Sequence, residues 1–130
     1  PLSSAQLVAS VKRAHDLGMA TIVCADSLAE ARALSLLEPT IMLCEPTELI
    51  GTGQTSDDDY MAMTNQAVKA LSPRTLIMQG AGIMTPEDVY RAIRSGADGT
   101  GCTSGIVKAP DPVQMLRDMV AAVDRAMKEG

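Results

Sequence analysis

The sequence contains no tryptophan and no phenylalanine, and its aromatic side chains are limited to Tyr60 and Tyr90. A hydrophobic core built from it must therefore be aliphatic, and nine methionines are available to fill irregular gaps. Hydrophobic residues nevertheless make up 46% of the 130 positions. That share is enough to bury a core, which argues against intrinsic disorder and predicts at most one ordinary domain.

An excess of positive charge is also missing. The formal net charge is -5, arginine and lysine are scattered, and no aromatic residues are interleaved with basic ones in a way that would stack bases. No apolar run is long enough to cross a bilayer, and no basic stretch precedes an apolar segment as it does in a secretory signal. These absences predict no nucleic-acid partner and no membrane partner.

Paired cysteines are absent too. Cys24, Cys44 and Cys102 are widely spaced, include no CxxC pair and are odd in number. Each lies in an apolar run, which favours buried thiols in a reducing cytoplasm over a disulfide or a metal site. The single histidine, His15, falls near the end of a predicted helix, where a solvated surface position is the simpler interpretation.

What the sequence does contain is an alternation of strand-like and helix-like segments. Apolar runs predict strands covered on both faces at 20–24, 41–44 and 75–78, and a fourth strand is expected from its place in the order at 98–102. One helix followed by four β-α units predicts an α/β fold with parallel strands and right-handed crossovers. Residues 1–130 form a single segment. Its start at Pro1, just before a helix, indicates a piece of something longer.

Helix starts are marked by side chains that can cap a first turn. Such caps are expected at Ser3 with Gln6, Ser27 with Glu30, Thr85 before Pro86, and Asp111 before Pro112. The acidic triplet Asp57, Asp58 and Asp59 opens the helix expected at 57–71. It could be interpreted as a metal site, but stabilisation of the helix N-terminus explains it more simply.

Two helices carry clear apolar faces. The helix at 86–95 is expected to bury Val89 and Ile93 and to end at Gly96 in a left-handed cap. The last helix has the cleanest periodicity, with one face formed by Val113, Leu116, Val120, Val123 and Met127.

In parallel α/β folds ligands meet the carboxyl ends of the strands, so the residues after each strand are candidates for function. Glu45 follows the second strand, the sequence QGAGI at 79–83 follows the third, and TSGIVKA at 103–109 follows the fourth. The two glycine-containing turns can aim backbone amides at a phosphate. A carboxylate beside such a pocket suits a general base, with the long connection 46–56 as a closing segment. The alternative is that Glu45 is an exposed turn residue and the connection is slack.

The sequence EPTELIGTG at 45–53 resembles the catalytic lid of the triosephosphate isomerase family. The sequences QGAGI, TPEDVYRAIRSGADG and SGIVKA are similar to the archaeal-type short members of that family, and the resemblance runs from the first helix to the last. It implies the C-terminal half of a TIM (β/α)8 barrel, about strands five to eight with their helices. It also implies a triosephosphate isomerase, which interconverts dihydroxyacetone phosphate and glyceraldehyde 3-phosphate in glycolysis and gluconeogenesis, without a cofactor or metal.

The resemblance also implies roles for particular residues. Glu45 matches the base that moves a proton between neighbouring substrate carbons. The lid would comprise Pro46, Thr47, Glu48, Leu49, Ile50, Gly51, Thr52 and Gly53, with the amide of Gly51 on the phosphate. The remaining substrate-binding residues would be Gly80, Ala81, Gly82, Thr103 and Ser104. The sequence departs from the family at Gln79, where Y-G-G-S or C-G-A-G is usual, and at 99–105, where the last strand is unusually polar and rich in glycine.

Half of the family's active site has no counterpart here. The asparagine and lysine after strand one and the histidine after strand four are missing, and His15 lies outside any matching motif. We therefore expect four strands with an uncovered inner face, which need a complementary N-terminal half-barrel or a second copy. The complete protein would be a homo-oligomer. The alternatives are a non-catalytic half-barrel that binds phosphorylated sugars or serves in assembly, and another phosphate-binding barrel enzyme.

Overall fold

The computed structural model, which describes residues 2–46 and 57–129, contains one sheet of four parallel strands in the order β1-β2-β3-β4. The strands are β1 (Ile22–Ala25), β2 (Ile41–Cys44), β3 (Leu76–Gln79) and β4 (Gly99–Thr100). The helices are α1 (Ser4–Asp16), α2 (Leu28–Ser35), α3 (Asp58–Leu71), α4 (Pro86–Arg94), α5 (Ser104–Val107) and α6 (Pro112–Lys128). The predicted parallel β-α order is confirmed.

The strand boundaries differ from the predicted ones by small amounts. The second strand matches its prediction, whereas the first and third strands begin later, at Ile22 and Leu76, and each extends one residue further. The fourth strand was predicted at 98–102 but comprises only Gly99 and Thr100. Glycines at 99 and 101 offer no side chain to hold a longer strand in place, which explains its shortness.

Side-chain caps begin the helices as the sequence predicts. The hydroxyl groups of Ser3 and Thr85 accept from the third amide of α1 and α4 and complete capping boxes. Ser27 caps α2, but the predicted capping box is wrong. The Glu30 carboxylate accepts from the amide of Asp26 at 2.8 Å and not from the amide of Ser27. Asp57 caps α3, which supports the helix-terminus interpretation of the acidic triplet. Gly96 has φ +96° after α4, as expected of a left-handed cap.

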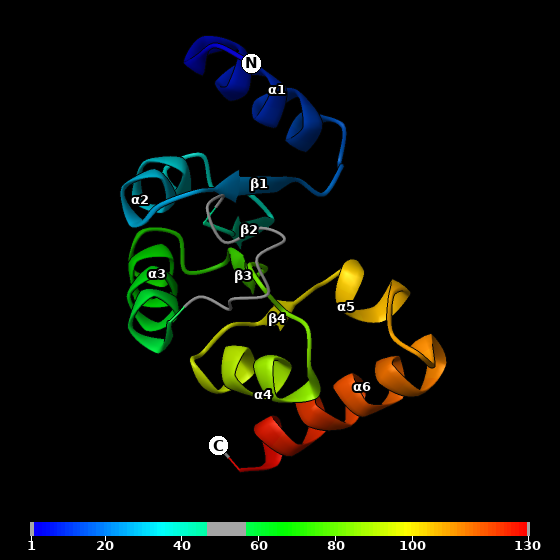
Figure 1. Ribbon diagram of the computed structural model, residues 1–130. Helices are drawn as coiled ribbons and strands as arrows, with labels where there is room; N and C mark the ends of the chain where they lie inside the picture. The colour runs from blue at the N-terminus through cyan, green and yellow to red at the C-terminus, as the bar shows by residue number, and fades with distance from the viewer. Residues whose placement is uncertain (1, 47–56, 130) are drawn as a thin grey trace.

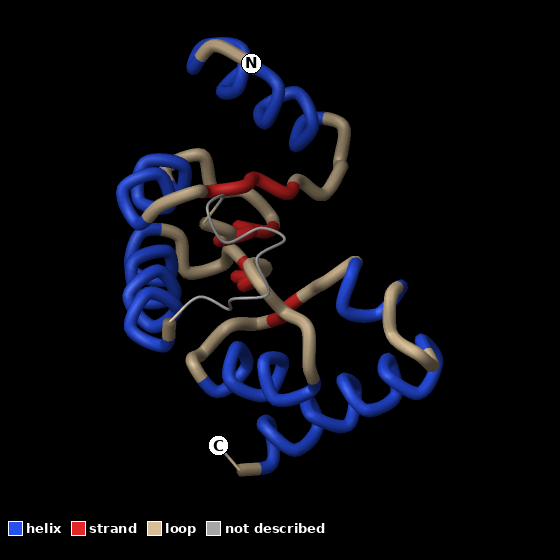
Figure 2. The backbone as a smooth tube through the Cα atoms, viewed as in Figure 1, coloured by secondary structure: helices blue, strands red, loops and turns tan. Residues whose placement is uncertain are grey.

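Helices α2, α3 and α4 lie along one side of the curved row of strands, and α6 lies against α4 (Figures 1 and 2). The apolar core lies in this layer, in two clusters. One is formed between the sheet and α2 and α3 by Ala25, Ala31, Met42, Cys44, Val68 and Ile77. The other is formed around α4 and α6 by Met61, Ile83, Val89, Ala92, Met119 and Ala122. Both are almost wholly aliphatic, as the composition requires.

The opposite, inner face of the sheet is not covered by the described residues. Exposure alternates along β1, where Val23 and Ala25 are buried while Ile22 and Cys24 are exposed. The parallel register places Ile22 beside Ile41 and Leu76 on this face, and Leu76 is 46% exposed. The prediction of strands covered on both faces therefore does not hold within this chain. The expectation of buried thiols is also wrong for Cys24, because its side chain lies on this uncovered inner face, although it holds for Cys44.

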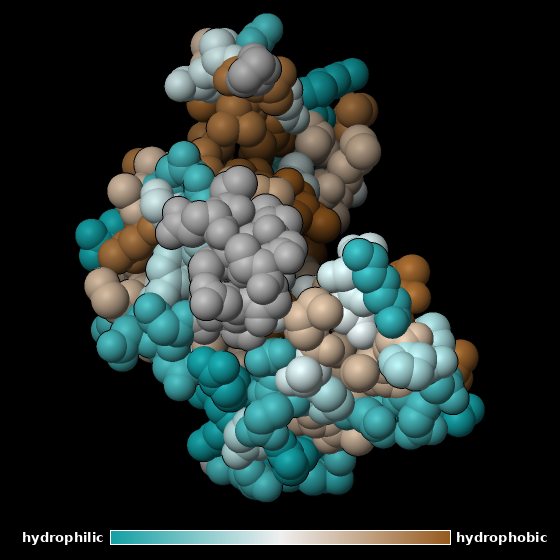
Figure 3. Space-filling model, in the orientation of Figure 1, coloured by the Kyte–Doolittle hydropathy of each residue, from teal (hydrophilic) through white to brown (hydrophobic). Residues whose placement is uncertain are grey.

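Two helices also expose apolar side chains. The face that α6 buries is not the predicted stripe: Met119, Ala122 and Ala126 are buried, and of the stripe Val123 packs against the cluster around α4. The stripe is largely solvent-facing: Val113, Leu116, Val120 and Met127 are exposed, and Val123 is half-buried. At the other end of the chain α1 buries only Val11, and apolar atoms gather between α1 and β1 (Figure 3).

No helix among the described residues is long and apolar enough to span a membrane. The histidine expected at the surface, His15, is exposed on α1, and its Nε2 lies 3.0 Å from the hydroxyl of Thr21.

Asp98 fastens the short β4 to the rest of the sheet. Its carboxylate accepts from the Ile77 amide at 2.8 Å and pairs with Lys69 of α3 at 2.8 Å. Burial raises the pKa of Asp98, but the hydrogen bonds from Lys69 and Ile77 outweigh it, and the pKa lies below its ordinary value. A carboxylate therefore joins three elements at the start of β4.

We predict that Asp98→Ala lowers the free energy of unfolding by roughly 1–3 kcal/mol at neutral pH, mainly by leaving the Ile77 amide without its charged acceptor. Because the folded-state pKa is lowered, the stabilisation is present above the unfolded-state pKa of about 3.9. It is lost as the pH falls through the folded-state value. Urea unfolding at several pH values measures this. Asp16→Ala, at an exposed pair with Lys12, is the control and should change stability by less than about 1 kcal/mol.

Candidate active site

Three segments that the sequence singles out follow neighbouring strands at one edge of the sheet. Glu45 and Pro46 follow β2, Gly80 begins the turn after β3, and Thr103 precedes α5 after β4. Parallel pairing in the order β2-β3-β4 brings these carboxyl ends to the same edge. The predicted clustering of the three turns is thus a consequence of the sheet order.

Glu45 is held at this edge by its backbone and lies against the next strand. Its amide donates to the carbonyl of Ala25 at 3.0 Å, and its side chain is half-buried. A Cβ atom built on Gly80 would lie 3.4 Å from Glu45 Cδ and 3.5 Å from Oε1. The carboxylate therefore lies directly over the backbone of Gly80.

Gly80 contributes through its lack of a side chain. A Cβ there would come within 2.9 Å of Leu43 Cδ1 as well as contacting Glu45. Its amide donates to the carbonyl of Cys44 at 3.1 Å and so continues the pairing of β2 with β3. The Gly80 amide is therefore already engaged, and an anion above the turn would meet the residues that follow, of which Gly82 has φ +71°.

The turn after β4 packs against the turn after β3. A Cβ built on Gly105, in α5, would lie 2.8 Å from the carbonyl oxygen of Ile83 and 3.0 Å from Met84 Cα. Beside it, the hydroxyl of Ser104 lies 3.6 Å from the sulfur of Met84. Only glycine allows this approach of two backbones, so Gly105 keeps Ser104 next to the predicted phosphate turn.

The predicted lid falls mostly outside the described residues. Of its members only Pro46 is described, and it is buried directly after Glu45. Thr47, Glu48, Leu49, Ile50, Gly51, Thr52 and Gly53 lie outside the described residues.

Sequence reasoning missed a buried polar cluster behind the site. Gln79, Thr64 and Asn65 are all buried, and Gln79 donates to both of the others. The available signal was the polar Gln79 at the end of an apolar strand. Burial also raises the pKa of the Cys44 thiol to about 11, an effect that a hydrogen bond with Thr64 partly offsets. Cys44 is therefore a neutral thiol at physiological pH and no nucleophile.

The described residues contain no group of three or more histidine, cysteine or acidic side chains arranged to hold a metal ion. The one histidine, His15, contacts Thr21 just before β1. It therefore lies near the amino-terminal ends of the strands, whereas Glu45 lies at their carboxyl-terminal ends. The acidic group of the site is thus Glu45, accompanied by two backbone turns.

Comparison with known proteins assigns the chain to a family. The profile of the family described as triosephosphate isomerase matches residues 2–122. The chain belongs to the triosephosphate isomerase family. It is 38% identical over 122 residues to the triosephosphate isomerase of Sulfurisphaera tokodaii and 37% identical over 122 residues to that of Metallosphaera sedula. These alignments cover 89% and 92% of this chain but 53% and 54% of the relatives. The chain spans about half the length of the curated relatives it matches.

Solved structures show the same partial match. A chain of the Amycolatopsis orientalis BexX/CysO complex superposes with a TM-score of 0.71 at 19% identity, covering 95% of this chain and 49% of that one. A structure described as native KDPGal superposes with a TM-score of 0.68 at 20% identity, covering 93% and 56%. Both are TIM-barrel-type proteins, so this chain of the triosephosphate isomerase family has the fold of about half a barrel.

We predict that Gly105→Ala separates the two turns, because the added methyl group meets backbone atoms that cannot rotate away. Overpacking of this kind costs roughly 1–3 kcal/mol of unfolding free energy, measurable by urea unfolding. Gly101→Ala is the matched control. Its Cβ would lie 3.5 Å from the flexible end of Met78, an ordinary contact, so stability should change little. Equal stability of the two variants would contradict the close packing of α5 on the β3 turn.

Proposed function

We propose that this chain supplies the catalytic base and the phosphate-binding half of a triosephosphate isomerase, which interconverts dihydroxyacetone phosphate and glyceraldehyde 3-phosphate. The observation that carries the proposal is the position of the Glu45 carboxylate over Gly80. It puts a proton acceptor beside a turn suited to the substrate phosphate. The membership of the family and the names of its relatives support the same reaction.

In the proposed reaction Glu45 takes a proton from one carbon of the bound triose phosphate and returns it to the neighbouring carbon, while the hydroxyl proton passes from one of the two substrate oxygens to the other. The intermediate is an enediolate, and the base is free again after each turnover. The phosphate lies between the turn at Ala81 and Gly82 and the backbone around Thr103 and Ser104. The lid residues, with the Gly51 amide on the phosphate, exclude water from the intermediate. The protein's own groups suffice, so the proposal includes no cofactor and no metal.

The site needs a partner to act. The oxyanion of the enediolate requires an electrophilic donor, and His15 lies at the wrong edge of the sheet to serve. The open inner face, with Ile22 at 60% and Leu76 at 46% exposure, requires cover as well. A complementary N-terminal half-barrel meets both needs, whereas a second copy of this chain would cover the face without adding the donor. The complete protein then acts as a homo-oligomer in the cytoplasm.

We predict that Glu45→Gln, in the chain combined with a family N-terminal half-barrel, lowers kcat by about 10²–10⁴-fold while substrate binding persists. The amide keeps the shape of the side chain but cannot accept the proton. Steady-state kinetics with glyceraldehyde 3-phosphate provide the measurement. Glu38→Gln, at the opposite end of β2, is the control and should retain activity. Normal turnover by the Glu45 variant would overturn the assignment of the base.

We also predict that the 130-residue chain alone does not isomerise triose phosphate and self-associates. Each uncovered apolar side chain forfeits roughly 1.5–3 kcal/mol relative to burial, and β1 and β4 are open edges that invite pairing. Sedimentation and an activity assay test this with and without the complementary half. A monomeric and fully active chain would refute the need for a partner. Binding of triose phosphate without turnover in the combined complex would instead indicate a non-catalytic module.

A further inference from the structure

The last residues of β2, β3 and β4 lie side by side in one row, on the face of the sheet that the helices cover. Cys44 of β2 pairs in register with Gln79 of β3, and Gln79 pairs with Thr100 of β4. The next residue after Cys44 is Glu45, and the next after Gln79 is Gly80. Any interaction that fixes this row therefore fixes the base relative to the phosphate turn.

Gln79 ties the row to α3 with a forked pair of hydrogen bonds. Its side chain is buried, and Nε2 donates to Thr64 Oγ1 and to Asn65 Oδ1, both at 2.9 Å. The direction of the first bond is fixed because the Thr64 hydroxyl already donates to the carbonyl of Tyr60 at 2.8 Å and can only accept from Gln79. The end of β3 is thus held to the helix by donors and acceptors that have no freedom to exchange roles.

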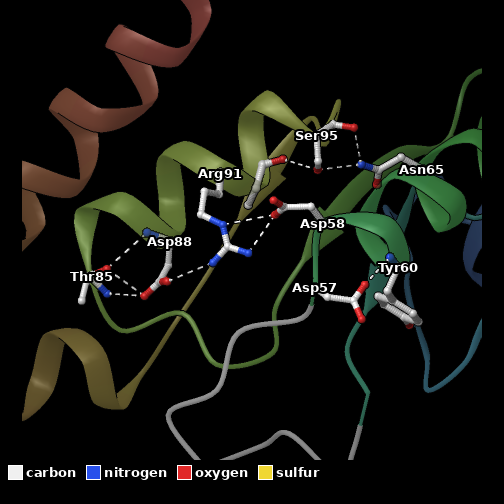
Figure 4. Close-up of polar contacts among 9 residues, drawn as sticks. Asp57, Asp58, Tyr60, Asn65, Thr85, Asp88, Arg91 and Ser95 are labelled. Atoms are coloured by element: carbon white, nitrogen blue, oxygen red, sulfur yellow. Dashed lines mark hydrogen bonds and ion pairs between the residues drawn. The ribbon is translucent and has the colours of Figure 1, made fainter.

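The same cluster reaches the elements on both sides. Asn65 donates to the carbonyl and hydroxyl oxygens of Ser95 at the end of α4, each at 3.0 Å, and Asp58 of α3 pairs with Arg91 of α4 (Figure 4). Thr100 Oγ1 donates to the Gln79 carbonyl at 2.6 Å, and Cys44 at the end of β2 pairs in register with Gln79. Gln79 is therefore the junction between α3 and all three strand ends that carry the site.

One polar atom of the Gln79 side chain is left without a partner. Gln79 Oε1 is buried without a hydrogen-bond partner among the described residues. A buried carbonyl in that state carries a desolvation cost, which an apolar side chain of the same size would avoid. The two bonds donated by the same amide act against this cost and hold the end of β3 to α3.

We propose that Gln79 is a positioning residue that sets the distance between the Glu45 carboxylate and the turn beginning at Gly80. The proposal rests on the isomerase function proposed above. Under the proposed function the turn at 80–82 holds the substrate phosphate, whereas the backbone of Glu45 is held by the Ala25 carbonyl of β1. Without the hydrogen bonds of Gln79, the turn and the substrate on it shift together relative to the Glu45 carboxylate. The turnover number therefore falls more than the affinity for substrate. Small misplacements of reacting groups are costly in rate.

The test uses the chain combined with its complementary half and the variant Gln79→Met, which keeps length and removes both donated bonds. Thr75→Val, at the residue just before the same strand, is the matched control. Thr75 is equally buried and bonds Pro39 O at 2.7 Å, but at the opposite end of β3. Thr64→Val removes one acceptor from the junction and serves if Gln79→Met does not fold, while Thr64→Ser keeps the hydroxyl. Kinetic constants and the amide chemical shifts of Glu45, Gly80 and Ala81 are measured for each.

Gln79→Met is expected to lower kcat about tenfold or more with KM changed less than about threefold, and to shift all three amides. Thr64→Val should act in the same direction and Thr64→Ser should restore both readouts, while Thr75→Val leaves them unchanged. Unmoved amides in Gln79→Met, or equal losses in Thr75→Val, would overturn the proposal. If the folded wild-type complex is inactive, the proposed function fails, and the amide shifts still decide whether Gln79 positions the turn.

Discussion

The parallel pairing of β2 with β3 is the interaction on which the rest of the structure depends. It runs from Ile41 beside Leu76 to Cys44 beside Gln79, and the amide of Gly80 extends it by one more bond to the Cys44 carbonyl. That last bond places Glu45 over a glycine that has no side chain to displace it. Gly105 then brings α5 against the same turn. A carboxylate and two turns from distant parts of the sequence are therefore arranged mainly by backbone contacts.

The two faces of the sheet have different surroundings. Its outer face is covered by helices and contains both the aliphatic core and the polar junction at Gln79. Its inner face exposes Ile22, Cys24 and Leu76. In a closed barrel such side chains fill the centre, and the catalytic groups come from the ends of several strands. Under the proposed function, a single complementary half-barrel would therefore complete both the core and the active site.

Polar and charged side chains also join neighbouring helices. Charged and polar pairs connect neighbouring helices beside the small aliphatic contacts, as Asn65 with Ser95 and Asp58 with Arg91 do between α3 and α4. Between α4 and α6 the guanidinium of Arg125 lies 4.1 Å from the centre of the Tyr90 ring and also pairs with Glu87. Directional contacts of this kind fix the relative positions of helices whose apolar side chains are small.

The sequence by itself determined the order of elements, the parallel sheet, most of the helix caps and the candidates Glu45, Gly80 and Ser104. These follow from local signals: apolar runs, capping side chains and the rule that sites lie after parallel strands. It could not determine which face of α6 packs, because its stripe at Val113, Leu116 and Val120 and the smaller residues at Ala122 and Ala126 are both apolar. Nor could it determine the exposure of Cys24 or the junction at Gln79. Those depend on which surfaces meet in three dimensions, and a residue's neighbours along the chain do not specify its neighbours across a sheet.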